Sequence, residues 1–176
     1  AGSFIVSGGD DGAVHLWNLV PERMRLFGNQ TTAPAKLAAV AWNGEFVTCN
    51  QEYELQFWDE QNGELTTSLP ALPSMPKRIA MSPNGESVAS IDDYGELQLT
   101  EVATGATHSI TLREENQAPF MPKSKVQMLF SPDGKWLCLV IGQRQLFMVN
   151  LATQMLNPLT KVQRKMLLNN GSVLDF

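Results

Sequence analysis

Side chains that could perform acid–base or nucleophilic chemistry are sparse in this sequence of 176 residues. Its two histidines, His15 and His108, lie far apart in the sequence and outside any motif that pairs an imidazole with a nucleophile or a second acid. His15 has apolar neighbours in an expected strand, where packing is its expected role. His108 falls in an expected outer strand, where we expect it to be exposed to solvent. The sequence therefore predicts no catalytic residue and no enzyme activity.

Candidate metal ligands are equally scattered. The acidic pairs occur in Asp10-Asp11-Gly12 and Asp92-Asp93-Tyr94-Gly95, and both stretches are typical of turns. A calcium site needs more oxygen ligands at close spacing, and a zinc site needs clustered Cys or His. Cys49 and Cys138 each lie inside an apolar run, so we expect both to be reduced thiols in the core. The sequence predicts neither a metal nor a cofactor.

Composition narrows the class of partner. The formal net charge is −5, and 43% of the residues are apolar. An acidic chain is poorly suited to the phosphate backbone of nucleic acids, and no apolar run approaches the roughly 20 residues that span a bilayer. We therefore expect neither a nucleic-acid nor a membrane partner. The absence of a signal-peptide pattern favours a cytoplasmic location, and a chain that opens on Ala1 in place of Met favours a piece of a longer protein.

A repeat gives the elements that would position any site. Four short apolar segments share one pattern, and Trp17, Trp58, Thr100 and Val149 are equivalent within them. Their spacings are 41, 42 and 49 residues, close to the period of about 40–45 residues of a propeller blade. The four segments are Val14–Leu19, Leu55–Asp59, Leu97–Val102 and Leu146–Leu151.

Turn motifs recur between these segments in the same register. Ser82-Pro83-Asn84-Gly85 and Ser131-Pro132-Asp133-Gly134 each follow an apolar strand and precede another. Proline presets the backbone of a turn, and Asn-Gly or Asp-Gly accepts a positive φ, so both predict hairpins. With a weaker strand after each repeated segment, every period predicts four antiparallel strands, which is one blade.

These features resemble the WD-repeat family, and Ser7-Gly8-Gly9-Asp10-Asp11-Gly12 leading to Trp17-Asn18 carries the resemblance best, together with Trp58-Asp59. The resemblance implies an all-β fold, a β-propeller of four-stranded antiparallel blades, about four of them present as a partial or half propeller. Within residues 1–176 the expected blades are 1–28, 36–70, 77–112 and 126–160. The resemblance also implies that Ser7, Asp11 and Trp17 are the remnant of the family's structural Asp-His-Ser-Trp network.

The first expected blade lacks an inner strand, and residues 172–176 have the pattern of one. Two alternatives follow. The strand 172–176 could close the first blade, in the same chain or in a homodimer of two half rings. Alternatively, the chain is a slice of a longer propeller, and its partners include the remaining blades of the same propeller.

Loops are the surface that such blades offer to a partner. The resemblance implies that the loops between blades share one face with the turns between the second and third strands. On that face we expect Tyr53, Tyr94, Phe120 and Met121 to contact a protein or peptide partner. The leading hypothesis is a non-catalytic interaction scaffold. The alternatives are a sensor or lid of a larger multidomain protein and a propeller that binds a small molecule in its central channel.

Overall fold

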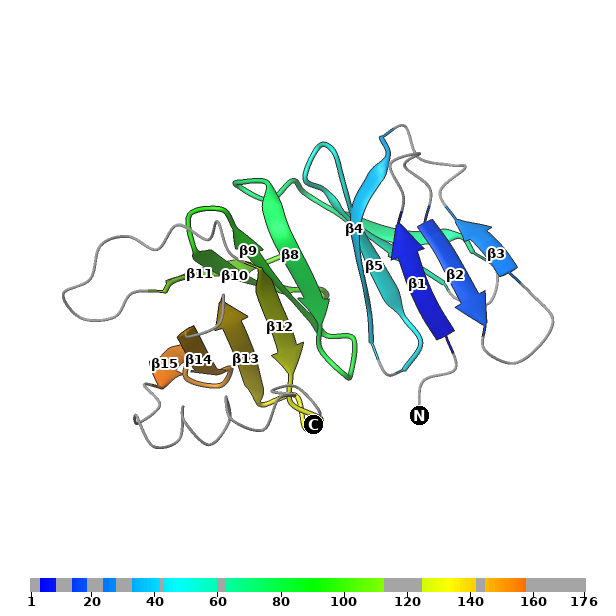
Figure 1. Cartoon of the computed structure of the whole chain (residues 1–176). Helices are drawn as coiled ribbons and strands as arrows, with labels where there is room; N and C mark the ends of the chain where they lie inside the picture. Colours follow the sequence, from blue (N-terminus) through cyan, green and yellow to red (C-terminus); the bar gives the residue numbers. More distant parts are fainter. Residues whose placement is uncertain are drawn as a thin grey trace.

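The computed structural model describes residues 4–8, 14–18, 24–27, 33–41, 43–59, 63–112, 125–141 and 145–157. Within residues 4–27, at residue 145 and at 155–157, the description covers the backbone alone. The described residues form strands and turns with no helix, and the strands group into antiparallel sheets that are arranged as blades of a partial β-propeller (Figure 1). The expected fold class is confirmed.

The described residues form fifteen strands in four sheets, and neighbouring strands in each sheet are antiparallel. The first sheet contains β1 (Phe4–Gly8), β2 (Val14–Asn18) and β3 (Met24–Phe27). The second contains β4 (Ala35–Val40), β5 (Phe46–Asn50), β6 (Leu55–Trp58) and β7 (Leu65–Leu69). The third contains β8 (Pro76–Met81), β9 (Ser87–Asp92), β10 (Glu96–Glu101) and β11 (Thr107–Thr111). The fourth contains β12 (Val126–Phe130), β13 (Trp136–Ile141), β14 (Gln145–Asn150) and β15 (Met155–Asn157).

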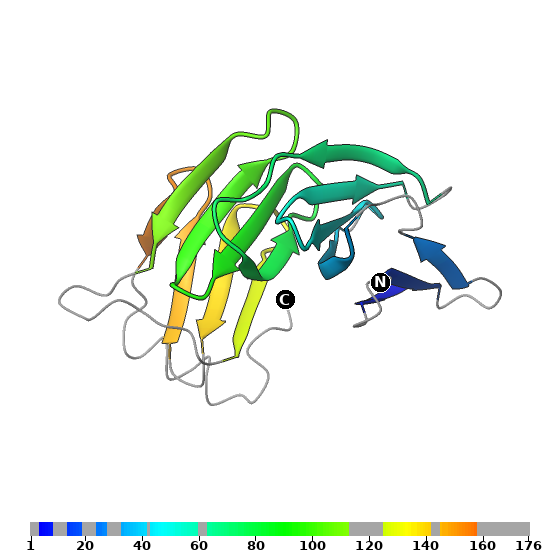
Figure 2. The same cartoon turned by 90° about the horizontal axis from the view of Figure 1, so that it is seen from above.

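The first strand of each sheet lies on the inside of the arrangement. Strand β1 lies beside β4, and β8 lies between β4 and β12, so these four strands follow one another around a common centre (Figure 1). Viewed from above, the sheets fan outward from these strands (Figure 2). The expected strand 172–176 lies outside the described residues, and the blade limits given above stay predictions.

Apolar side chains fill the spaces between successive sheets. One cluster joins the second and third sheets, and a second cluster joins the third and fourth. Strand β9 contributes to both, because Val88 faces the first cluster while Ala89 and Ile91 belong to the second. A strand that is buried on both faces is expected where a sheet lies between two others.

The two Ser-Pro hairpins have the predicted backbone. Gly85 and Gly134 adopt φ of 79° and 67°, which glycine accepts without steric cost. In each turn the serine hydroxyl accepts a hydrogen bond from the backbone N–H five residues later, from Ser87 to Ser82 at 2.9 Å and in the same way within the second hairpin at 3.0 Å.

The cysteines are buried, as predicted. Cys49 and Cys138 are free thiols whose exposed fractions are 1% and 4%. Burial raises the pKa of Cys49 to about 12 and that of Cys138 to about 11, because a thiolate is poorly solvated inside the protein. Both side chains therefore stay neutral near pH 7. The exposure predicted for His108 on β11 is also confirmed.

Candidate interaction surface

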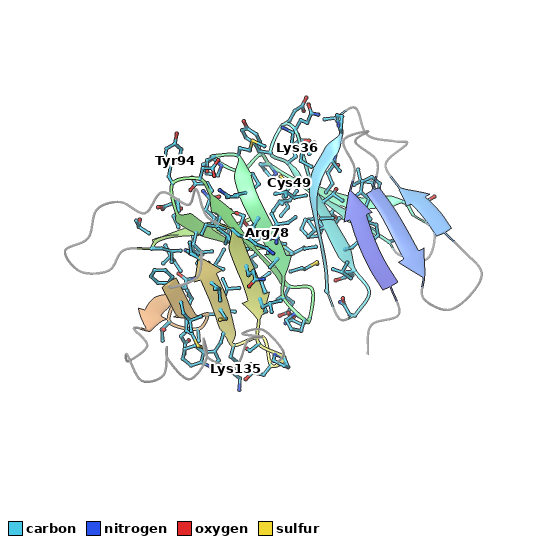
Figure 3. All side chains as sticks on the ribbon, viewed as in Figure 1. Lys36, Cys49, Arg78, Tyr94 and Lys135 are labelled. Atoms are coloured by element: carbon cyan, nitrogen blue, oxygen red, sulfur yellow. The ribbon has the colours of Figure 1, made fainter. Side chains whose placement is uncertain are left out.

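Loops and turns at one end of the second and third sheets form a surface that we call the loop face. It comprises residues 50–54, 70–77 and 92–96. Figure 3 shows Tyr94 and Lys36 at this end of the molecule and Lys135 at the other. The loop from β7 to β8 and the turn from β9 to β10 are adjacent, because Pro76 at the start of β8 pairs with Asp92 at the end of β9.

The carboxylate of Asp92 connects these two segments. Its side chain is 6% exposed. One oxygen accepts hydrogen bonds from the backbone N–H groups of Tyr94 at 2.8 Å and Glu96 at 2.9 Å. The other oxygen accepts one from the Ser74 hydroxyl at 2.8 Å. Hydrogen bonds to an ionised acceptor are stronger than neutral ones, so Asp92 fixes the turn 92–96 and anchors the loop 70–75 to it.

Two large side chains project from the segments that Asp92 fixes. Tyr94 is 72% exposed and Met75 is 45% exposed. Beside them, Lys77 and Asp93 form an ion pair of 2.9 Å. An exposed aromatic ring and an exposed thioether, on two segments that buried hydrogen bonds hold together, are well suited to contact a partner.

The turn at Tyr53 has the same design with different residues. Asn50, which is 2% exposed, occupies the position in this turn that Asp92 has in the other. Its side-chain oxygen accepts hydrogen bonds from the N–H groups of Glu52 and Glu54 at 2.9 and 3.0 Å. Tyr53 occupies the position that Gly95 has in the other turn, with φ of 68°. Its side chain is half-buried and packs against the cluster between the second and third sheets. Tyr53 therefore offers less surface than Tyr94, and its contact with a partner stays a prediction.

The other expected contact residues, Phe120 and Met121, lie outside the described residues. Asp11 of the expected structural network does too, and for Ser7 and Trp17 only the backbone is described. Ser7 pairs with His15 on β2, two residues before Trp17. The hydrogen-bond network of Ser7, Asp11 and Trp17 therefore stays a prediction.

A bond of the expected kind is present one sheet later. The Trp58 indole N–H donates to the Thr48 hydroxyl at 2.9 Å, and both side chains are buried. Thr48 pairs with Gln56, two residues before Trp58, which is the register that Ser7 has on β1. Phe46 stacks on Trp58 at a ring-centroid distance of 6.2 Å. Sequence reasoning missed this pair, although Thr48 precedes Trp58 by the same ten residues that separate Ser7 from Trp17.

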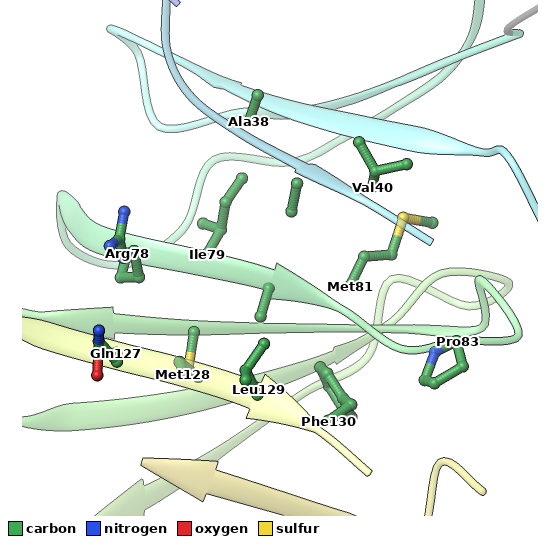
Figure 4. Close-up of a pocket in the computed structure, with 12 residues that line it drawn as sticks. Ala38, Val40, Arg78, Ile79, Met81, Pro83, Gln127, Met128, Leu129 and Phe130 are labelled. Atoms are coloured by element: carbon green, nitrogen blue, oxygen red, sulfur yellow. The ribbon is translucent and has the colours of Figure 1, made fainter. Parts of the chain in front are cut away.

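The inner strands line an open groove of about 440 Å³ (Figure 4). Its lining comes from β4, β8 and β12 and is mostly apolar. Arg78 is the charged residue of this lining, and its Nε–H donates to the Val126 carbonyl oxygen at 3.2 Å. The residue types of the lining are mostly apolar, but polar atoms make up about half of its exposed surface, and its one charged side chain is hydrogen-bonded to the backbone.

In the part of the chain that the structure describes, no three His, Cys, Asp or Glu side chains group in a way that could hold a metal ion. The same part contains no helix that is long and apolar enough to cross a membrane.

Sequence reasoning also missed Met75. Its flanking prolines mark an exposed loop, but the sequence does not show that Ser74 ties this loop to Asp92.

Comparison with known proteins gives a distant relative. No family model matches the chain. The chain is 23% identical over 145 residues to the Drosophila melanogaster protein named "Protein LST8 homolog", a WD-repeat protein. The match covers 80% of this chain and 46% of the relative, so the chain spans less than half the length of the relative that it matches. The sequence is thus distantly similar to that of one WD-repeat protein.

Proposed function

We propose that this chain is a non-catalytic interaction scaffold that binds a protein or peptide through the loop face. The observation that carries the proposal is the exposure of Tyr94 and Met75 on segments that the buried Asp92 carboxylate fixes. The similarity to a WD-repeat protein supports a scaffold role in general terms.

Preformed loops favour binding for a physical reason. Association costs the conformational entropy of every segment that becomes ordered, so a surface that is already fixed retains more of the contact free energy. Tyrosine adds large contact area with few rotatable bonds, and tyrosine is enriched among the residues that dominate binding energy. On this surface Tyr94 is the main anchor, Met75 extends the apolar contact, and the Lys77–Asp93 pair borders it.

The same geometry is compatible with a place in a larger protein. The relative extends well beyond the matched region, so a role as the sensor or lid of a multidomain protein belongs to the same proposal, with the loop face as the contact surface. A small-molecule site in the central channel has less support, because the groove along β4, β8 and β12 has a single charged side chain, Arg78, which is hydrogen-bonded to the backbone.

Site-specific photo-cross-linking tests the proposal. A photoreactive phenylalanine analogue replaces Tyr94 in the full protein, and the matched control carries it at His108, an exposed residue on the outer strand β11. After irradiation in an extract of the source cells, mass spectrometry identifies the adducts. We expect one recurrent protein adduct from position 94 that position 108 does not give. Identical adducts from both positions, or none from position 94, would contradict the proposal.

A further inference from the structure

A second surface lies at the opposite end of the sheets from the loop face. Among the described residues, 43–45, 59, 63–64, 82–86, 101–106 and 131–135 form this end, which we call the hairpin face. Between the second and third sheets it contains a cleft of about 420 Å³. Glu45 and Asp59 line this cleft together with Phe57, Thr67 and Val102. The cleft therefore combines two carboxylates with apolar surface.

The position of Glu45 is set by both sheets. The Asn43 amide donates to the Glu45 carboxylate at 2.9 Å and to the Asn84 carbonyl oxygen in the third sheet at 3.3 Å. The same carboxylate occupies the space that a β-carbon at position 85 would need, and Gly85 has none. The absence of a side chain at Gly85 thus leaves room for the Glu45 carboxylate, and Glu45 lines the cleft.

The apolar part of the cleft comes from the core between the sheets. Phe57 is 5% exposed and belongs to the cluster that joins the second and third sheets, and the half-buried Val102 packs against that cluster. Thr67 on β7 is exposed. The cleft therefore passes from polar, solvated atoms to apolar, buried ones.

Charge is unevenly divided between the two ends of the described sheets. On the loop face and at the strand ends beside it, carboxylates and lysines alternate: Glu52, Glu54, Asp92, Asp93 and Glu96 with Lys36, Lys77 and Lys125. The hairpin face holds Glu45, Asp59, Glu64, Glu86, Glu101 and Asp133 with Lys135. Lys135 lies 3.8 Å from Asp133. Among the described residues, the potential around the cleft is therefore negative, and such a surface attracts cationic partners.

We infer that this cleft binds a lysine or arginine side chain from a basic segment of a protein partner. Both side chains have an apolar stem and a cationic head. The stem would lie against Phe57 and Val102, and the head would pair with Glu45 and Asp59 through charge-assisted hydrogen bonds. This site lies at the opposite end of the sheets from Tyr94, so it goes beyond the proposed loop-face function and does not depend on it.

A peptide titration tests this inference. The probe is an acetylated peptide of alternating alanine and arginine, and its control replaces each arginine with citrulline, which keeps the shape and removes the charge. Amide NMR spectra of the full chain are recorded during both titrations. We expect the arginine peptide to shift the resonances of residues 43–45, 57–59, 67 and 102, and the citrulline peptide to leave them unchanged. Shifts spread over both faces, or equal shifts with citrulline, would overturn the inference.

Two pairs of neutral substitutions separate the cleft from overall charge. Glu45→Gln with Asp59→Asn removes both carboxylates of the cleft, and Glu52→Gln with Asp93→Asn removes the same charge from the loop face. We expect the first pair to weaken binding by about tenfold or more and the second by less than about twofold, because close charge pairs contribute more than distant ones. Equal weakening by the two pairs would refute a specific cleft.

A third variant keeps the charge and blocks the space. Thr67→Trp places a large ring at the exposed wall of the cleft, so we expect it to weaken the arginine peptide as well. Unchanged affinity in this variant, with dispersed amide resonances that show a folded chain, would overturn the inference. Failure of the peptide tests would leave the photo-cross-linking result at Tyr94 unaffected, so the two proposals fail separately.

Discussion

Replacing Asp92 with alanine removes the acceptor that holds the two loop-face segments together. Three hydrogen bonds disappear, from the Ser74 hydroxyl and from the N–H groups of Tyr94 and Glu96. Each bond to an ionised group contributes about 1.5–3 kcal/mol. The turn borders solvent, so water replaces part of this contribution, and we expect Asp92→Ala to lower the free energy of unfolding by about 2–4 kcal/mol.

The preceding sheet supplies the matched control. Asn50 performs the same task in the turn before β6, where its side-chain oxygen accepts two backbone N–H groups. Asp92→Asn keeps such an oxygen, so we expect a loss of only about 1 kcal/mol. Urea unfolding of the full chain, followed by tryptophan fluorescence, measures both variants. An alanine variant within about 0.5 kcal/mol of wild type, or an asparagine variant as unstable as alanine, would refute the role assigned to Asp92.

Three further predictions concern turns and buried groups. Gly85→Ala and Gly134→Ala should each cost about 1 kcal/mol in urea unfolding, because both positions have positive φ. Gly85→Ala should cost a few tenths more, since side chains contact that position and none lies near Gly134; equal costs would contradict this reasoning. Thr48→Val leaves the buried Trp58 N–H without its acceptor and should lower the free energy of unfolding by about 1–3 kcal/mol. An unchanged melting temperature in calorimetry would contradict this prediction. Burial raises the pKa of Cys49 to about 12, so the folded state retains a proton that the unfolded thiol loses above pH 9. Stability should therefore fall between pH 9 and 12, and less steeply in a Cys49→Ala variant.

The repeat period and the turn motifs were sufficient to predict the sheets. Asn84-Gly85 and Asp133-Gly134 predict positive φ by local chemistry alone, and the structure confirms it at both glycines. Strand positions follow from the same cause, because the short apolar runs of β5, β9 and β13 are also local patterns. These features depend on neighbours in the sequence, which a single chain displays directly.

The interaction surfaces depend on residues that are distant in the sequence, and these were harder to predict. The sequence Asp92-Asp93 indicates a turn, and the structure shows that the Asp92 carboxylate also accepts a hydrogen bond from Ser74, 18 residues earlier. Asn43 and Asn84 are 41 residues apart, yet their contact helps to form the cleft at Glu45. Such contacts require the relative placement of two sheets, which spacing alone does not give.

Isothermal titration of the partner captured at position 94 is the most direct test of the loop face. The wild-type chain is compared with Tyr94→Ala and with His108→Ala, which removes an exposed side chain from an outer strand. If Tyr94 is the main anchor, its removal weakens binding by at least about 30-fold, corresponding to about 2 kcal/mol, whereas His108→Ala stays within about twofold. Equal affinities of the Tyr94→Ala variant and the wild-type chain would contradict the proposed binding surface.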